Sequence, residues 1–480
     1  MAESWAIEEM STADLEDRRL NGRLREVLSA LGDRPAASIP AACGGHAEMT
    51  AAYRFFDNEN ASFERILAPH AEAARRRVAG QKTVVLAQDT TEADLTRPER
   101  PVQGAGPLDA GPRRGMFVHV LHAFGEDGTP LGTLHAERWA RPDGGGEAPP
   151  RVRARTRPIE QKESYRWVET LRQAQAEARR CPATHMICVG DSEADIYEVL
   201  AQAQNGPDNA DWVVRSCKDR AVQHGAAPTE RRLHDLAQAQ PVLFTHAIRV
   251  RGRRAKVACD QRARRQPRQS RQATVEVRAA ARVLLRAPWR PAGRPPPVSV
   301  NVVLVSESNP PDDEPVEWLL LTSLPVETPA QARDAIRFYC LRWMIEVFFR
   351  VLKSGCRVEE RRFETMERFT SCLAVYLIVA WRTLYVCRLG RACPEMDCEA
   401  IFDPAEWKAL WTIARHSAPP AKPPSLGEIT RMVAELGGYV PRKNSPPGPQ
   451  TIWLGLQRAH DFALCWNRFG PEVRKDGPLV

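Results

Sequence analysis

The segment AIRFYCLRWMIEVFFRVLKSG, residues Ala335 to Gly355, constrains the fold of this 480-residue chain more than any other. At roughly 100° per residue, as in an α-helix, its polar residues fall within an arc of about 80°. They are Tyr339, Arg342, Glu346, Arg350 and Lys353. A neighbouring apolar stripe would pack against a core, and it consists of Leu341, Ile345, Phe348, Phe349 and Leu352. The spacing predicts one helix that holds a carboxylate among three cations and a phenol.

This polar face suits a phosphodiester held beside a metal ion, because cations and a phenol donate hydrogen bonds to phosphate oxygens. A simpler interpretation is a set of exposed salt bridges, since Arg342, Glu346 and Arg350 are spaced at i, i+4 and i+8. Trp318 and Trp343 leave two alternatives as well. They belong either to a core or to a surface that stacks on nucleobases.

A net charge of +8 and an isoelectric point near 9.0 favour an acidic partner, of which nucleic acid is the commonest. A basic enzyme without a polyanionic partner is the alternative. Residues 11–32 predict a helix with an N-cap at Ser11 or Thr12 and an end at Gly32. Small basic helices of this kind often lie against the DNA backbone, although a solvated charged face is equally consistent. The cations that crowd this helix are Arg18, Arg19, Arg23 and Arg25.

The chain is too long for one compact core, and its middle alternates apolar strands with helical segments. This order predicts an α/β fold with a mixed sheet. Short Arg-heavy strands between about 225 and 312 predict an inserted β-subdomain, with a cationic loop at 249–271 that contacts phosphates or only keeps the chain soluble. The predicted segments are an N-terminal helical region (1–75), an α/β core in two parts (76–222 and 313–390), the insert (223–312) and a C-terminal helical region (391–480).

The 12 cysteines contain no C-x-x-C pair, so we expect reduced, mostly buried thiols rather than a zinc site or a disulfide scaffold. The acidic N-terminus MAESWAIEEM does not look like a signal peptide. The apolar run from Cys372 to Trp381 is ten residues long, too short to cross a bilayer. These features predict a cytoplasmic protein that is not associated with a membrane.

Three carboxylates complete the candidate site. Asp89 follows the apolar run TVVLAQ, Asp191 follows MICVG, and Glu346 lies on the helix described above. Carboxylate oxygens from rigid elements are the ligands that a pair of Mg²⁺ ions requires. Asp191 has an alternative role as the N-cap of a helix beginning near Glu193. Asp94, Glu193 and Asp195 are rival ligands by residue type alone.

The residues in these positions resemble a known family. The sequence is similar to DDE transposases of the insertion-sequence-four family, and most similar to the Tn-five type. The segment QDTT holds the family's first catalytic aspartate and VGDSEADIYEVL its second. The signature Y-x(2)-R-x(3)-E-x(6)-K is met by Tyr339, Arg342, Glu346 and Lys353. One departure is Arg350, where the Tn-five type has lysine, so a planar guanidinium replaces a point charge.

The resemblance implies a ribonuclease-H-like catalytic core with a β-insert before the glutamate. It implies that Asp89, Asp191 and Glu346 bind two Mg²⁺ ions, which Mn²⁺ can replace. It also implies a homodimer in the synaptic complex, acting on double-stranded DNA at the transposon-end inverted repeats and at a target. The residues that it assigns to DNA contact are Tyr339, Arg342, Arg350, Lys353, Arg215, Trp318 and Trp343.

The expected reaction is cut-and-paste transposition. Water cleaves the element end, the freed 3′-hydroxyl forms a hairpin on the opposite strand, and the reopened end joins target DNA. Two other functions stay open. The chain could be a catalytically silent relative that binds ends and inhibits an active partner, or a metal-dependent nuclease that cuts DNA without joining it.

Overall fold

The structure, a computed structural model, describes residues 4–97, 99–143, 157–223, 231–250, 269–289, 295–310, 315–441 and 446–471. Its chain divides into two compact units. The first contains Met1–Val84, Asp89–Ala148 and Met344–Val480, and the second contains Val85–Gln88 and Pro149–Trp343. Strand β1 (Thr83–Asp94) therefore contributes to both units. Residues 251–268 of the predicted Arg-rich loop lie outside the described residues.

The first unit begins with short helices, as expected, but the predicted N-cap is wrong. Ser11 belongs to the last turn of the preceding helix, where its N–H donates to the carbonyl of Glu8. The cap is Asp17, whose carboxylate accepts the N–H of Arg19 at 2.7 Å. The helix also continues past Gly32, where the absence of a Cβ makes room for the ring of Trp5. The helices are α1 (Ser4–Glu9), α2 (Arg18–Asp33), α3 (Ile39–Cys43), α4 (His46–Phe56) and α5 (Phe63–Ala79).

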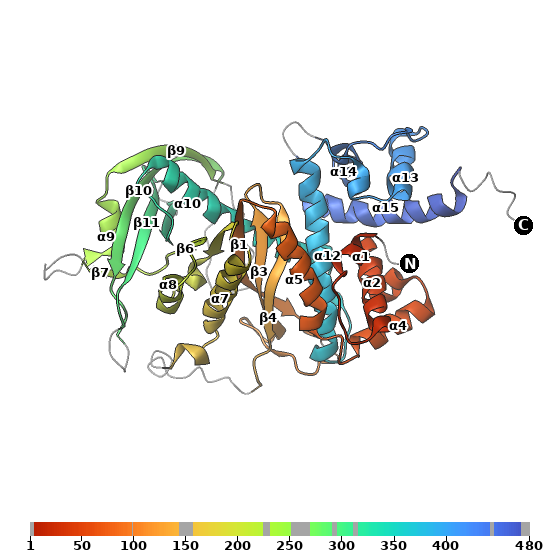
Figure 1. Cartoon of the computed structure of the whole chain (residues 1–480), viewed down its shortest axis with the longest axis horizontal. Helices are drawn as coiled ribbons and strands as arrows, with labels where there is room; N and C mark the ends of the chain where they lie inside the picture. Colours follow the sequence, from red (N-terminus) through yellow and green to blue (C-terminus); the bar gives the residue numbers. More distant parts are fainter. Residues whose placement is uncertain are drawn as a thin grey trace, which may run out of the picture. The chain divides into compact units, whose positions relative to one another are not determined.

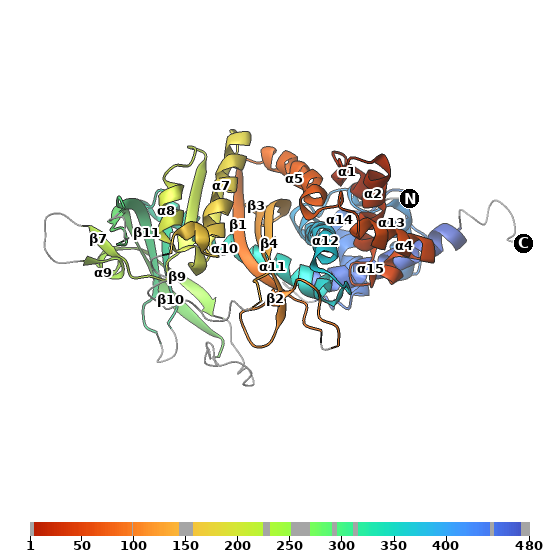
Figure 2. The same ribbon diagram turned by 90° about the horizontal axis from the view of Figure 1, so that it is seen from below.

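A long apolar helix, α12 (Met366–Ala392), forms the core of this unit and packs against α5, α2 and β4 (Figures 1 and 2). By length and composition alone α12 could cross a membrane, but 78% of its most apolar 18-residue window is buried. The apolar run Cys372–Trp381 is one part of it. The same unit contains β2 (Gly106–Pro107), β3 (Arg114–Gly125) and β4 (Pro130–Trp139), and β3 and β4 form an antiparallel pair.

The second unit is built on a mixed sheet, which confirms the predicted α/β class. Strands β5 (His185–Gly190) and β6 (Ala210–Arg215) are parallel, whereas β12 (Glu317–Thr322) pairs antiparallel with β6. The strand order is β1-β5-β6-β12-β11-β10-β7-β8, with β9 on β10. The remaining strands are β7 (Ala221–Gln223), β8 (Arg231–Arg232), β9 (Val242–Val250), β10 (Arg271–Leu285) and β11 (Val298–Glu307).

Strands β9 to β11 come from the region predicted as an inserted β-subdomain and lie side by side (Figure 1). Strand β11 pairs with β12 from Asn301 to Ser306. They therefore extend the same sheet. Helices of this unit are α7 (Tyr165–Arg180), α8 (Tyr197–Ala203), α9 (Leu233–Gln238) and α10 (Pro329–Leu341), with 3₁₀ turns at Ile159–Gln161 and Ser192–Ala194.

The signature segment is not one continuous helix, contrary to the sequence prediction. Helix α10 ends at Leu341, and α11 (Trp343–Arg350) begins two residues later. At the junction the N–H of Arg342 donates to the carbonyl of Tyr339, three residues earlier. A π-helical turn, Val351–Gly355, follows α11. The boundary between the units falls between Trp343 and Met344. Angular offsets calculated for an uninterrupted helix therefore do not describe this polar face.

The apolar stripe of the same segment is confirmed, because Ile345, Phe348, Phe349 and Leu352 are buried. The C-terminal part of the first unit continues with 3₁₀ turns at Val358–Glu360 and Cys398–Ala400. Helices α13 (Pro404–Arg415), α14 (Leu426–Leu436) and α15 (Pro449–Phe469) then pack around Trp407 and Leu410. Helices α14 and α15 approach closely at Gly455, where an added Cβ would lie 1.8 Å from the carbonyl oxygen of Val433.

We expect Gly455→Ala to lower the free energy of unfolding by about 1–3 kcal/mol, because the new methyl would force α14 and α15 apart. Urea unfolding followed by circular dichroism measures the change. Gly22→Ala is the matched control. Position 22 lies inside α2 with open space around it, so the alanine should stabilise the helix by about 0.5–1 kcal/mol. Equal stabilities for the Gly455→Ala variant and the wild type would contradict the close approach.

Candidate active site

Asp89 lies inside β1, so the prediction that a strand ends there is wrong. The continuous buried run of the strand ends at Gln88, and the strand itself continues to Asp94. Asp89 Oδ1 accepts the N–H of Thr90 at 2.8 Å. The Thr90 hydroxyl in turn hydrogen-bonds to Nδ1 of the buried His119 on β3, at 2.7 Å. The backbone that carries Asp89 is thus fixed from the neighbouring strand.

Asp94 at the end of β1 is bonded to Glu359, which also pairs with Lys353, a predicted DNA contact. Glu359 accepts the N–H of Asp94 at 3.0 Å and lies 3.5 Å from the Lys353 ammonium. Asp94 itself pairs with Arg113 at 3.6 Å. Burial raises the pKa of Asp94, but hydrogen bonds from Thr96 and the charge of Arg113 outweigh it and lower the pKa. Lys353 is therefore held in an ion-pair network within the first unit.

Glu346 lies on α11, which is anchored to the first unit by its buried neighbours. The ring of Phe348 contacts that of His122 on β3, with centroids 4.4 Å apart. Glu346 is partly exposed and Arg350 is exposed. Trp343 has an exposed fraction of 50%, which excludes the core alternative for this residue. The sequence therefore placed the buried and solvent-facing sides of α11 correctly.

Asp191 follows β5, as predicted, and it does cap a short helix. Its Oδ1 accepts the N–H of Glu193 at 2.8 Å, and the cap opens the 3₁₀ turn Ser192–Ala194. The structural role that the sequence left open is thus present. It does not exclude metal binding, because the capping bond uses one carboxylate oxygen and the residue is partly exposed.

Four predicted DNA-contacting residues gather with Asp191 in the second unit. Tyr339 is 7% exposed, and its ring meets that of Trp318 edge to face at 5.8 Å. Burial raises the pKa of Tyr339, and Asp191 adds to this, whereas Arg342 and Arg215 act in the opposite direction. The net pKa is raised, so the phenol stays protonated at neutral pH and can donate a hydrogen bond.

Of the rival ligands, Asp195 is excluded by its surroundings. Its side chain has no solvent exposure and is ion-paired with Arg220. Glu193 is exposed and Asp94 is paired as described above. The N-terminal cations lie on α2, where Arg18 and Arg19 are exposed and Arg23 is 2.8 Å from Glu26. Their DNA contacts remain a prediction.

The three predicted metal ligands do not all lie in one unit. Asp89 and Glu346 belong to the first and Asp191 to the second. Across the described residues, no group of three or more His, Cys, Asp or Glu side chains is placed to hold a metal ion. The donor set itself fits Mg²⁺, because all three side chains are partly exposed carboxylates with hard oxygen donors. That these three carboxylates bind the same metal ions is therefore a proposal.

Three family models match the chain in succession. Transposase DNA-binding matches residues 2–61, Transposase DDE domain matches 164–381, and Transposase Tn5 dimerisation domain matches 378–468. Together they give the domain order of a Tn5 transposase. The chain belongs to the insertion-sequence-four family of DDE transposases, Tn-five type. The mixed sheet and the DDE-domain match also confirm the predicted ribonuclease-H-like core, and the family implies dependence on a divalent metal.

A solved structure also resembles the transposase: the piggyBac transposase synaptic complex with hairpin DNA, determined by cryo-electron microscopy. The match covers 68% of this chain but about half, 53%, of the piggyBac chain, at 7% sequence identity and a TM-score of 0.32. At that score we draw no conclusion from it.

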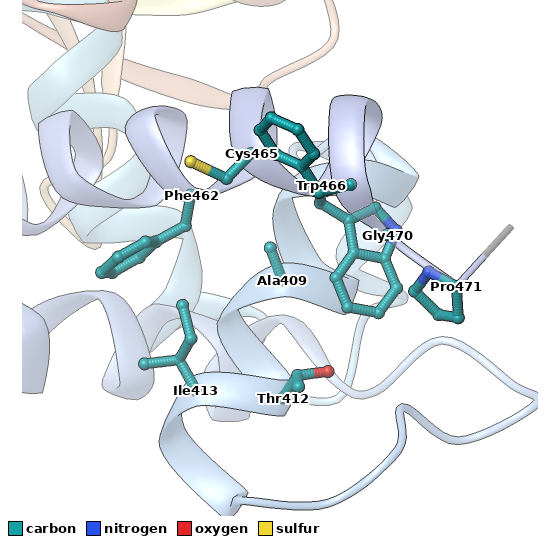
Figure 3. A pocket seen from close by; sticks show the side chains of 9 residues that line it. Ala409, Thr412, Ile413, Phe462, Cys465, Trp466, Gly470 and Pro471 are labelled. Carbon is teal, nitrogen blue, oxygen red and sulfur yellow. The ribbon is translucent and has the colours of Figure 1, made fainter. Parts of the chain in front are cut away.

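A pocket of about 370 Å³ lies between α13 and α15, within the residues that match the dimerisation domain. Phe462, Cys465 and Trp466 project from α15 toward Ala409 and Ile413 on α13 (Figure 3). It is remote in sequence from the three carboxylates and contains no acidic side chain, so it has no part in the metal chemistry. The flanking matches show that the transposase carries a transposase DNA-binding domain and a Tn5 dimerisation domain.

Three residues that bond to predicted site residues or to their neighbours in the chain were not predicted for that role from the sequence. His119 and Glu359 were not identified, and Asp195 was considered only as a possible metal ligand. The one indication in the sequence is proximity, because Asp195 lies four residues after Asp191 in the segment VGDSEADIYEVL. Its partners are residues 216–220, more than twenty positions later, and no local pattern indicates them.

Proposed function

We propose that this transposase cuts the ends of its element by metal-dependent phosphodiester hydrolysis and joins the 3′-hydroxyl ends to target DNA. The observation that carries the proposal is the DDE-domain match over residues 164–381, which includes Asp191 and Glu346. Asp89 lies before that match and is assigned by the resemblance of its QDTT segment to the family. A hairpin on the opposite strand is the proposed intermediate between cleavage and joining.

Asp89, Asp191 and Glu346 would hold two Mg²⁺ ions, for which Mn²⁺ can substitute. When bound, such ions lower the pKa of water and stabilise charge on the scissile phosphate. The three side chains contribute fixed negative charge from partly exposed positions. Two of them are oriented by backbone N–H groups, those of Thr90 and Glu193. This limits the rotamers that the carboxylates adopt before DNA arrives.

The second-unit cluster would grip the DNA backbone next to Asp191. Arg342 and Arg215 present guanidinium groups, and Tyr339 presents a neutral phenol whose raised pKa keeps its proton. Charge-assisted hydrogen bonds from these groups fix a phosphate in place. Arg350, exposed on α11, adds a further cation, and Lys353 would exchange its pairing with Glu359 for a phosphate oxygen.

The two tryptophans would support a nucleobase turned out of the duplex during hairpin formation. Trp343 is half exposed, which suits stacking on a base, and Trp318 is partly buried against Tyr339. Stacking on an aromatic ring contributes about 1–3 kcal/mol per base. The roles proposed for Arg18, Arg19 and Arg23 are contacts of α2 with the backbone of the inverted repeat.

We propose a homodimer in the synaptic complex, with the α13–α15 region supplying the contact between copies. The apolar lining of its pocket and the exposed Leu464 and Phe469 support this assignment. The enzyme would act in the bacterial cytoplasm on nucleoid DNA.

A metal-removal experiment tests the proposed reaction. We expect purified transposase to cut a duplex that carries an inverted repeat from the DNA flanking the gene, and to join pre-cleaved ends to a plasmid. Both products should require Mg²⁺ or Mn²⁺ and disappear with EDTA, because no side chain on the proposed site replaces the ions as Lewis acid. Gel electrophoresis of labelled DNA measures both.

The products distinguish the alternatives. Joined plasmid supports the transposase. Cleavage of ends without any joined product would identify a metal-dependent nuclease. Binding of the repeat without cleavage, at every metal concentration, would identify a catalytically silent inhibitor. Cleavage that persists in EDTA would refute the metal-dependent reaction itself.

A further inference from the structure

Asp195 lies close to the proposed site in sequence but is built into the protein interior. Both of its oxygens accept hydrogen bonds from the segment that follows β6. Oδ2 accepts from the hydroxyl of Ser216 at 3.0 Å and from the N–H groups of Cys217 and Lys218 at 3.0 and 3.1 Å. Oδ1 accepts from Nε of Arg220 at 3.1 Å and from a terminal nitrogen of the same guanidinium. Asp195 therefore has its acceptor capacity filled by protein donors.

The backbone of the same turn is tied to the same segment. The carbonyl of Asp195 accepts from the Lys218 ammonium at 2.6 Å and from Arg220 at 2.9 Å. One residue of the 3₁₀ turn joins in, because the carbonyl of Ser192 accepts from the Cys217 thiol at 3.3 Å. Two chain segments, 192–195 and 216–220, are thus joined by side-chain and main-chain bonds together.

Each of these segments directly adjoins a proposed site residue. Asp191 is the N-cap that opens the 3₁₀ turn, and Asp195 is the residue that closes it. Arg215 is the last residue of β6, immediately before Ser216. The carbonyl of Asp191 also accepts the N–H of Ala194 at 3.2 Å, so the turn between them is rigid. A displacement of Asp195 would therefore move Asp191 and Arg215 together.

A carboxylate is required at this position for a physical reason. Five donors point at the two oxygens of Asp195, and two of them belong to a guanidinium that is itself only 11% exposed. An asparagine would present an amide N–H₂ to one set of donors and leave buried groups unpaired. Breaking one partner of a buried ion pair leaves the other charge uncompensated, so the segments would separate.

We propose that Asp195 is a positioning residue: with Arg220 it holds Asp191 in place to bind the metal ion and Arg215 in place to contact phosphate. This inference rests on the proposed function for the role of Asp191. In this role Asp195 orients a metal ligand, whereas the sequence alone left Asp195 as a possible metal ligand itself. Loss of a hydrogen-bonding partner that orients a metal ligand typically weakens metal affinity by about 10- to 100-fold.

The experiment compares Asp195→Asn and Arg220→Gln with the wild type and with Glu307→Gln. Glu307 is the matched control, because its side chain is 3% exposed, is ion-paired with Arg271 in the same unit, and accepts the N–H of Val316. Two readouts are taken. One is the affinity for Mn²⁺ by titration calorimetry, and the other is the Mg²⁺ concentration that gives half-maximal nicking of end DNA.

We expect both Asp195→Asn and Arg220→Gln to weaken Mn²⁺ binding at least about tenfold and to raise the Mg²⁺ midpoint correspondingly. Glu307→Gln should change neither value. Hydrogen exchange of the Cys217 and Lys218 amides, followed by mass spectrometry, should accelerate in Asp195→Asn, since both amides donate to the replaced carboxylate. Arg220→Gln retains those two amide bonds and provides the test if Asp195→Asn does not fold.

The outcomes separate this inference from the proposed function. Faster exchange with unchanged Mn²⁺ affinity and an unchanged Mg²⁺ midpoint would overturn the positioning role, because Asp195 would then be only structural. Equal weakening in Glu307→Gln would overturn it too. A wild type that binds Mn²⁺ but does not nick would refute the proposed reaction, while weaker Mn²⁺ binding by the two variants would still support the positioning role.

Discussion

Replacing Asp191 with asparagine is expected to lower metal-dependent cleavage of end DNA on the order of 1,000-fold or more, while the protein stays folded. Asparagine is as good an N-cap as aspartate, so the bond from the Glu193 N–H to the side chain at position 191 should persist. The amide, however, removes the negative charge that a divalent ion requires. Nicking rates at saturating Mg²⁺, with unfolding curves for both proteins, measure the two effects separately.

This substitution distinguishes a role of Asp191 as a helix N-cap from a role as a metal ligand. If the side chain served only as a cap, asparagine would retain nearly full activity. Asp191→Ala is the companion variant, because it removes the cap as well and should cost about 1 kcal/mol of stability. Substantial nicking by Asp191→Asn would therefore refute the ligand assignment, whatever the family match.

Glu9→Gln is expected to lower the free energy of unfolding by about 3 kcal/mol. Glu9 is 4% exposed and bonds in a bidentate manner to Arg77, at 2.9 and 3.0 Å. It also accepts from Nδ1 of the buried His70, at 2.5 Å. Glutamine would leave the Arg77 guanidinium without a counter-charge in a mostly apolar setting, which is strongly destabilising. Urea unfolding at pH 7 measures the loss.

His70 is neutral in the folded protein, so Arg77 supplies the positive charge that pairs with Glu9. Burial lowers the pKa of His70, although Glu9 opposes this. Its Nε2 accepts the N–H of Thr133 at 3.0 Å, which requires that this nitrogen carry no proton. Nδ1–H is then the donor to Glu9. The three side chains link α1 and α5 to β4, so their loss should loosen the N-terminal helices first.

The same network gives a defined pH dependence. Burial would raise the pKa of Glu9, but hydrogen bonds from His70 and Arg77, together with the charge of Arg77, outweigh it and lower the pKa from 4.5 to about 2. A lowered carboxyl pKa stabilises the fold above the unfolded value and loses that contribution as the pH falls through the folded value. The stability difference between wild type and Glu9→Gln should therefore be largest above pH 4.5 and shrink toward pH 2.

Glu16→Gln is the control, because Glu16 forms a solvent-exposed pair with Arg65 and its removal should leave the free energy of unfolding nearly unchanged. Equal stabilities for Glu9→Gln and Glu16→Gln would contradict the buried network. So would a difference between Glu9→Gln and wild type that did not change with pH.

Parts of the fold were predictable from local sequence. The apolar stripe of Ile345, Phe348 and Phe349 gave the buried side of α11, and the apolar run MICVG gave the strand before Asp191. The site of the helix break was not predictable. Arg342 is neither glycine nor proline, and the break there depends on the packing of α10 and α11 in different compact units rather than on a breaker residue.

The sequence by itself determined which acidic, basic and phenolic side chains this transposase offers for the proposed site, and the order of its DNA-binding, DDE and dimerisation domains. Only the tertiary structure decided which acidic residues are available. Asp191 stays partly exposed, whereas Asp195, four residues later, is buried against Arg220. The reason is physical. Local pattern fixes helix and strand periodicity, but burial and ion pairing depend on side chains that distant segments bring into contact.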